Sequence, residues 1–154
     1  MLSFDTNLAV YAANSDMNEH EPARRFLQSL GTRCDVVVCD LMLVELYLKL
    51  RNARVFPRPL SAGEAAARCE QFRNNANWTL VESAPVMEAV WKMAAQKDFA
   101  IRRIVDARLA LTLRHHGVTE FATANVKDFE GLGFARVWNP ISNPQPCFPS
   151  PACP

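Results

Sequence analysis

The sequence predicts an α/β protein with three layers, α/β/α, around a central parallel sheet. Short apolar runs alternate with longer segments in which apolar residues recur at helical spacing. Residues 36–39 are apolar throughout, which is typical of a strand that is buried on both faces. Strands that alternate with helices favour parallel pairing through crossover helices.

The expected elements follow from these runs and from the residues that interrupt them. Strands are expected at residues 2–4, 36–39, 78–82, 120–123 and 134–138. Helices are expected at residues 8–13, 21–30, 41–53, 61–74, 85–97 and 104–116, with a turn or short helix at 124–129. Ser61 and Glu64 have the spacing of a capping box, and Gly117 is placed to end a helix.

Length and composition indicate one globular domain. The chain has 154 residues, of which 49% are hydrophobic and 21% charged. We see neither an apolar run of membrane length nor a signal peptide, so we expect a cytoplasmic protein without membrane association. The domain is expected to span residues 1–140, followed by a proline-rich tail at 141–154 that shows no periodicity.

The charge of the whole chain does not indicate a polyanion partner, because the net charge is only +1. Arginines nevertheless form two groups along the chain. These groups are Arg51, Arg54 and Arg58, and then Arg102, Arg103 and Arg108. Arginine binds phosphate through a planar fork, so either group could form a nucleic-acid surface. A general bias of the genome toward arginine would explain the same pattern.

Acidic residues recur where strands of such a sheet would end. They are Asp5 after the first strand, Glu45 and Asp106 in two of the helices, and Asp128 after the fourth strand. Parallel strands would bring all of them to one edge of the sheet, where ligands of open α/β sheets collect. Asp5 taken alone could equally be a helix cap, because Asp is a favoured N-cap residue.

A cluster of carboxylates is costly, because like charges repel and raise one another's pKa. A divalent cation removes this cost, and ligands that are all oxygen favour Mg²⁺ or Mn²⁺. Such a site suits phosphodiester hydrolysis, in which a metal activates water and stabilises the leaving oxygen. The sequence has no glycine-rich phosphate loop, no serine nucleophile elbow and no paired-histidine zinc motif. A phosphatase with Asp5 as nucleophile would need a second acid where Asn7 stands.

At these positions the sequence resembles the PIN-domain ribonucleases, and most closely the VapC toxins of bacterial toxin–antitoxin pairs. Its four motifs are matched by residues 3–7, 44–46, 105–107 and 123–129. The resemblance implies Mg²⁺- or Mn²⁺-dependent RNA cleavage, a homodimer and an antitoxin that occupies the active-site groove. It also implies metal binding by Asp5, Glu45 and Asp106, and a polar, substrate-binding role for Asn7 and Thr123.

The fourth motif departs from the family, because Asn125 stands where many members have Asp. We expect Asp128 to complete the acidic, catalytic set, since a full charge gains more from a divalent ion than an amide does. Asn125 would then orient a water or a substrate phosphate. Asp128 could instead cap the short helix.

The leading hypothesis is therefore a metal-dependent endoribonuclease toxin that a cognate antitoxin inhibits. The alternative is a PIN-like module that binds RNA or protein without cleavage. We expect the antitoxin to dock on the helix at 41–53 and on the segment that follows, beside Tyr47, Leu48, Val55 and Phe56. The same side chains could instead pack the core or a homodimer interface.

Overall fold

The computed structural model describes residues 1–144 of the chain. Its strands are β1 (Leu2–Phe4), β2 (Val37–Cys39), β3 (Thr79–Val81), β4 (Glu120–Ala122) and β5 (Arg136–Trp138). Its helices are α1 (Thr6–Ala13), α2 (His20–Leu30), α3 (Asp40–Leu50), α4 (Ala62–Arg73), α5 (Met87–Ala94), α6 (Arg103–His115) and α7 (Val126–Phe129). Every expected strand and helix is present, with small shifts at the ends.

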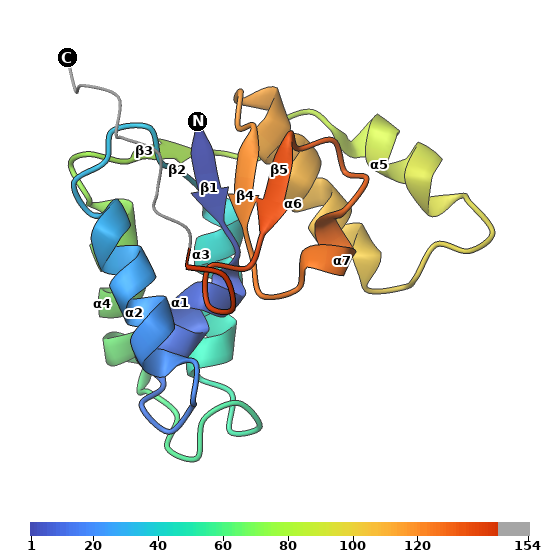
Figure 1. Ribbon diagram of the computed structural model, residues 1–154. Helices are drawn as coiled ribbons and strands as arrows, with labels where there is room; N and C mark the ends of the chain where they lie inside the picture. The colour runs from blue at the N-terminus through green and yellow to red at the C-terminus, as the bar shows by residue number, and fades with distance from the viewer. Residues whose placement is uncertain (145–154) are drawn as a thin grey trace.

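All the strand pairs are parallel, as predicted. β1 pairs with β4, β4 pairs with β5, and β2 pairs with β3. A parallel bridge between Leu2 and Val36 joins the two sets, and the Leu2 amide donates to the Asp35 carbonyl at 2.9 Å. The resulting order is β3-β2-β1-β4-β5, visible across the centre of Figure 1. The carboxyl ends of β1 and β4 therefore lie next to each other, where α1 and α7 begin.

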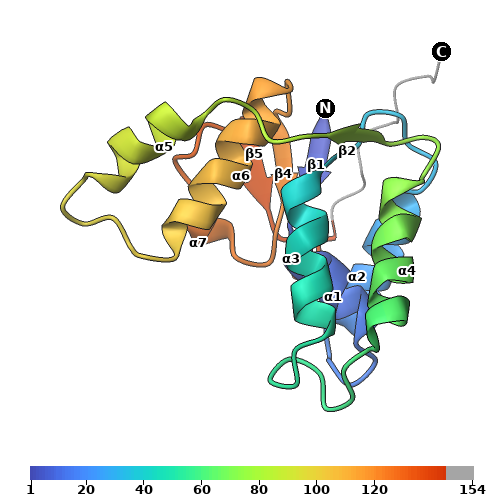
Figure 2. The same ribbon diagram turned by 180° about the vertical axis from the view of Figure 1, so that it is seen from behind.

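Helices cover both sides of this sheet, which confirms the three-layer α/β/α prediction. α3 and α6 lie in front of the strands in Figure 2, with α1 and α2 behind them. α4 packs beside α3, and α5 contacts α6 while extending to one side of the sheet. This arrangement places α3 and α6 on the same face, so residues from both helices can reach one cleft.

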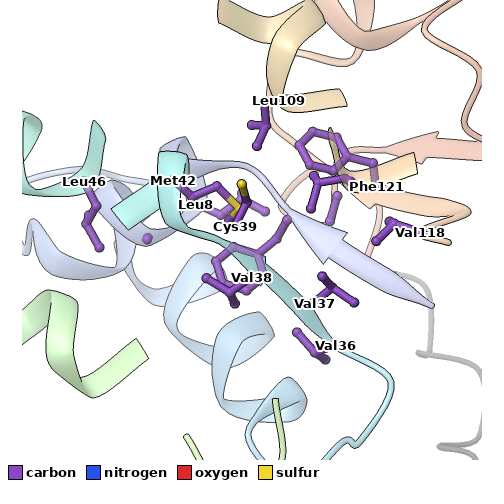
Figure 3. Close-up of a cluster of buried hydrophobic side chains, with 14 of the residues drawn as sticks. Leu8, Val36, Val37, Val38, Cys39, Met42, Leu46, Leu109, Val118 and Phe121 are labelled. Carbon is purple, nitrogen blue, oxygen red and sulfur yellow. The ribbon is translucent and has the colours of Figure 1, made fainter. Parts of the chain in front are cut away.

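The core is built from the strands and the inner faces of these helices. Residues 36–39 are at most 1% exposed, as expected for a central strand with helices on both faces. Figure 3 shows this run beside Leu8, Met42 and Phe121, which come from α1, α3 and β4. Full burial of a large apolar side chain stabilises a fold by roughly 1.5–3 kcal/mol. This shared core therefore holds the carboxyl ends of the strands in register.

Two predicted helix signals have the expected geometry. The Ser61 hydroxyl accepts from the Glu64 amide at 3.3 Å, and Glu64 accepts from the Ser61 amide at 2.9 Å, which completes the capping box at α4. Gly117 follows α6 with φ at +82°, in the left-handed region that glycine adopts most easily. The start of α4 and the end of α6 were therefore predicted correctly from the sequence.

Two helices are shorter than expected, for different reasons. α3 ends at Leu50 because Asn52 turns the chain, accepting the Arg54 amide on its side chain at 2.9 Å. α5 covers only Met87–Ala94, and Val90 is its buried residue. A helix that buries so little gains little from further turns, because helical stability in proteins comes mainly from packing.

The predicted domain boundary near residue 140 is only partly visible. Pro140 is buried and Ile141 packs against the core, so the described chain stays attached to the domain up to this point. Most of the predicted tail, from residue 145 onward, lies outside the described residues. Within residues 1–144, no helix combines the length and the apolar character needed to cross a membrane.

Candidate active site

The acidic residues predicted from the sequence meet at one cleft. The cleft has a volume of about 540 Å³ and is lined by Asp5, Glu45, Asp106 and Asp128. These residues come from the end of β1, from α3, from α6 and from α7. Asn7 and Asn125 line the same cleft. A second cavity of about 500 Å³, between α1, α2 and α4, has no carboxylate in its lining. We therefore place the chemistry at the acidic cleft.

Asp5 is held by a network of hydrogen bonds that joins β1 to β4. The Thr123 hydroxyl donates to Asp5 Oδ2 at 2.6 Å, and the Asn7 side-chain amide donates to the same oxygen at 2.8 Å. Asn7 also accepts from the Ala124 amide at 3.3 Å. The side chain of Asp5 is therefore fixed in orientation by partners that are far apart in the sequence.

Asp5 is a helix cap and also lines the acidic cleft. It is the N-cap of α1, and its Oδ1 accepts from the Asn7 amide at 3.4 Å. Its other oxygen, Oδ2, accepts from Thr123 and Asn7, and the residue is 9% exposed and lines the cleft. Capping therefore fixes the backbone at the end of β1 while Asp5 still lines the cleft that it shares with the other acids.

Thr123 has a different place from the one expected. We predicted a polar residue in contact with the substrate, but its side chain is fully buried behind Asp5. Its oxygen also accepts from the Asn125 amide at 3.0 Å and from Asn7 Nδ2 at 3.1 Å. Its contacts are therefore with Asp5, with Asn7 and with the backbone of the fourth motif, not with the open cleft.

The surroundings of Asp5 disfavour its charged form. Burial is the largest cause that raises the pKa of Asp5 to about 6, helped by the charges of Glu45 and Asp106 and opposed by the hydrogen bonds from Thr123 and Asn7. The Thr123 and Asn7 bonds favour the charged form, yet desolvation outweighs them. A positive charge in the cleft would reverse this balance.

Asp106 behaves in the same way. Burial is the largest cause that raises the pKa of Asp106 to about 6, followed by the charges of Asp128 and Glu45, while Arg103 lowers it. Glu45 and Asp106 act on Asp5, and Glu45 and Asp128 act on Asp106. The four carboxylates, which come from separate elements, are therefore close enough to repel one another.

Asn125 and Asp128 both line the cleft, so both remain candidates for the fourth residue of the acidic site. Asn125 is exposed and occupies the N-cap position of α7 without a side-chain capping bond. Asp128 lies inside α7, and its amide donates to the Asn125 carbonyl at 3.0 Å. Asp128 is therefore not the N-cap of α7, and its effect on Asp106 favours it as the acid of this motif.

The donor set fits Mg²⁺ or Mn²⁺ better than zinc, because it consists of oxygens only. No group of three acidic, histidine or cysteine side chains within residues 1–144 is placed to hold an ion alone. Mg²⁺ is usually bound through one or two carboxylates together with waters and substrate phosphates. Thr6 also lines the cleft, and its buried hydroxyl has no hydrogen-bond partner among the described residues.

Three of the lining residues that were not assigned to the site from the sequence carry a polar or charged group at the end of a long side chain. They are Tyr11 of α1, Lys49 of α3 and Arg102 at the start of α6. Lys49 follows Glu45 by four residues and lies 4.0 Å from it, and Arg102 precedes Asp106 by four. Residues four apart share a helix face, so this spacing could have identified both cations.

Comparison with known proteins shows the family of the chain. The PIN domain family matches residues 3–134. Ribonuclease VapC24 of Mycobacterium tuberculosis, from strain CDC 1551 / Oshkosh and from strain ATCC 25618 / H37Rv, is 55% identical over 143 residues. This alignment covers 93% of the present chain and 99% of the relative.

Solved structures share the fold at low sequence identity. A crystal structure of Mycobacterium tuberculosis VapC20, described as a sarcin-ricin loop cleaving toxin, has a TM-score of 0.61 at 19% identity, covering 79% of this chain and 87% of that one. A structure of FitAB bound to an IR36 DNA fragment also has a TM-score of 0.61 at 19% identity, covering 92% and 96%. With the matched motifs surrounding one acidic cleft, the chain belongs to the PIN-domain family, with VapC ribonucleases among its relatives.

Proposed function

We propose that this chain is a VapC-type toxin, a metal-dependent endoribonuclease that hydrolyses RNA phosphodiester bonds in the cytoplasm and is inhibited by a cognate antitoxin. One observation carries the proposal. Carboxylates from four elements converge on one cleft at the carboxyl edge of the sheet. Similarity to Ribonuclease VapC24 along nearly the whole chain supports the same activity.

Asp5, Glu45 and Asp106 are the residues that would hold the metal. A bound Mg²⁺ or Mn²⁺ supplies an activated water and a positive charge next to the leaving oxygen. Thr123 keeps Asp5 oriented through its 2.6 Å hydrogen bond, so the ligand does not have to reorganise. Asn125, exposed in the same cleft, can donate its side-chain amide to a phosphate oxygen.

Cleavage of a fluorescently labelled RNA tests the proposed function. We expect the wild type to cut with Mg²⁺ or Mn²⁺ and to lose activity in EDTA. Asp5→Asn, Glu45→Gln and Asp106→Asn should each abolish cleavage while the proteins stay folded by circular dichroism. Asp98→Asn is the matched control, because Asp98 is exposed and outside the cleft. Cleavage at the wild-type rate by all three site variants would place the active site elsewhere.

The alternative function is RNA or protein binding without cleavage. Asn125 favours it, because this amide stands where many family members have an acid. The same assay separates the two functions. Labelled RNA that is bound but remains intact in Mg²⁺ and in Mn²⁺ would favour the binding module.

The predicted antitoxin surface needs one correction. Phe56 is 6% exposed and belongs to the core, because the chain folds back after α3. Leu48 is 62% exposed and Val44 is 61% exposed on the outer face of α3, so this helix still offers an apolar surface. We propose that α3 contributes to contacts with the antitoxin or with a second copy in a homodimer.

Expression in bacteria tests these partner proposals. We expect the toxin to arrest growth when expressed alone, and a small neighbouring gene to restore growth and co-purify with it. Light scattering on the purified chain should show a dimer. Unimpaired growth together with a monomeric protein would contradict the toxin and dimer proposals.

A further inference from the structure

Two cationic side chains, Lys49 and Arg102, line the acidic cleft. They differ in whether contacts within the protein account for their positions. Lys49 lies in the last turn of α3, where a cation interacts favourably with the helix dipole. It is also 4.0 Å from Glu45 in the preceding turn. Helix stability and this ion pair therefore account for Lys49 without a ligand.

Arg102 has no comparable explanation. It occupies the N-cap position of α6, where the helix dipole is positive and a cation is unfavourable by roughly 0.3–1 kcal/mol. Its side chain makes no hydrogen bond or ion pair with any residue in the described part of the chain. The side chain is exposed and lines the cleft. A cation in an unfavourable position without a protein partner is available for an anionic ligand.

The other arginines of this sequence group are engaged elsewhere. Arg103 donates to the Glu130 carbonyl at 3.2 Å, and Arg108 donates to the Ser83 hydroxyl at 3.2 Å. Neither of them lines the cleft. Arg103 is close enough to Asp106 to lower its pKa, but of the group Arg102, Arg103 and Arg108 only Arg102 both lines the cleft and is exposed to solvent.

We infer that Arg102 binds a phosphate of the RNA backbone next to the cleaved bond and positions the strand in the cleft. This inference rests on the proposed RNA cleavage. The acids repel RNA phosphates, and a cation on the cleft wall offsets this repulsion for the part of the strand that lies beside them. The planar guanidinium can bind two oxygens of one phosphate at once. Arg102 is thus a substrate-positioning residue for single-stranded RNA backbone, outside the metal-binding set.

RNA binding is measured most cleanly in a protein that does not cut its ligand. We would use Asp5→Asn as the common background, because Asn also caps helices and its side-chain oxygen can accept from Thr123. Fluorescence anisotropy with a fluorescein-labelled single-stranded RNA 12-mer then gives the dissociation constant at several salt concentrations. The comparison is made with and without Arg102→Gln.

We expect Arg102→Gln to weaken binding about tenfold, as for the loss of one charge-assisted hydrogen-bonded contact. The slope of log affinity against log salt should fall by about 0.7, the value for one phosphate contact on a single strand. Arg102→Lys should keep most of the salt slope but recover only part of the affinity, because lysine lacks the planar fork. The melting temperature should stay unchanged or rise, since a cation leaves the helix N-terminus.

Arg25→Gln is the matched control, because Arg25 is an exposed helical arginine outside the cleft. An equal loss of affinity and slope in Arg25→Gln and Arg102→Gln would overturn the assignment, since any surface charge would then suffice. Unchanged affinity and slope in Arg102→Gln, with tight binding by the background protein, would overturn it as well. No binding by the background protein would overturn both the proposed function and the role of Arg102.

Discussion

Asp106→Asn should stabilise the metal-free protein, even though it removes a residue of the proposed active site. Burial and the charges of Asp128 and Glu45 raise the pKa of Asp106 from 3.8 to about 6. The ionised carboxylate is therefore less stable in the folded chain than in the unfolded chain at neutral pH. An amide of nearly the same shape avoids this repulsion.

The size of the effect follows from the shift. About two pKa units at 1.36 kcal/mol each give an upper bound of about 3 kcal/mol. Asp106 is only partly buried, so water screens the repulsion, and the attraction of Arg103 is lost as well. We therefore expect a gain of about 1–2 kcal/mol at pH 7, which raises the melting temperature by about 3–6 °C in a chain of this size.

The stability gained by Asp106→Asn should depend on pH. For an acid with a raised pKa in the folded state, the destabilisation is absent below pH 3.8 and complete above about pH 6. The stability advantage of Asp106→Asn should accordingly be full at pH 7, shrink as the pH falls through 6, and vanish near pH 4. Mg²⁺ should then stabilise the wild type more than the variant, because it binds the folded carboxylate site.

Differential scanning calorimetry in EDTA and in Mg²⁺ measures both effects. Asp98→Asn serves as the control, since Asp98 is exposed and its substitution should change the free energy of unfolding by less than about 0.5 kcal/mol. A melting temperature of Asp106→Asn in EDTA at pH 7 that is equal to or below that of the wild type would refute the reasoning. Asp106 would then be a structural residue of α6.

Three further substitutions test separate parts of the site and fold. Thr123→Val should destabilise the protein by about 1–3 kcal/mol in chemical denaturation, because Asp5 loses the donor of its 2.6 Å hydrogen bond. The cleavage rate should fall as well, and cleavage at the wild-type rate would show that Thr123 does not act on the site. Asp128→Asn should weaken Mn²⁺ binding in calorimetric titration; if instead only Asn125→Asp alters the affinity, position 125 is the fourth ligand. Ser61→Ala should cost about 1 kcal/mol through the lost capping box and leave RNA cleavage unchanged, and a loss of cleavage would mean that α4 acts on the site.

Much of the fold was predictable because its signals are local. The apolar run at residues 36–39, the Ser61 capping box and Gly117 each fix an element through short-range chemistry. The short α5 was not predictable, because its length depends on how little of it the tertiary structure buries. Phe56 was misplaced for a related reason, since an apolar residue after a helix can face the core or the solvent.

The candidate site was predictable to the level of its acids but not of their partners. Strand ends place Asp5 and Asp128 at the same edge of the sheet through topology alone. The burial of Thr123 behind Asp5 depends on the register of β1 against β4, which pairs Phe4 with Ala122. Sequence spacing cannot show that register. The spacing of four residues between Arg102 and Asp106 indicates one helix face. Only the structure shows that Arg103 and Arg108 bind Glu130 and Ser83 instead of lining the cleft.

The central claim is that the acidic cleft holds the cation used for RNA cleavage. Anomalous diffraction from crystals soaked in Mn²⁺ tests it most directly, because the ion is located without reference to activity. The structure predicts a manganese peak in the cleft, bound to the carboxylates of Asp5 and Asp106 and absent from crystals of Asp106→Asn. A protein that cleaves RNA with Mn²⁺ but shows its manganese peak away from these carboxylates would contradict the claim.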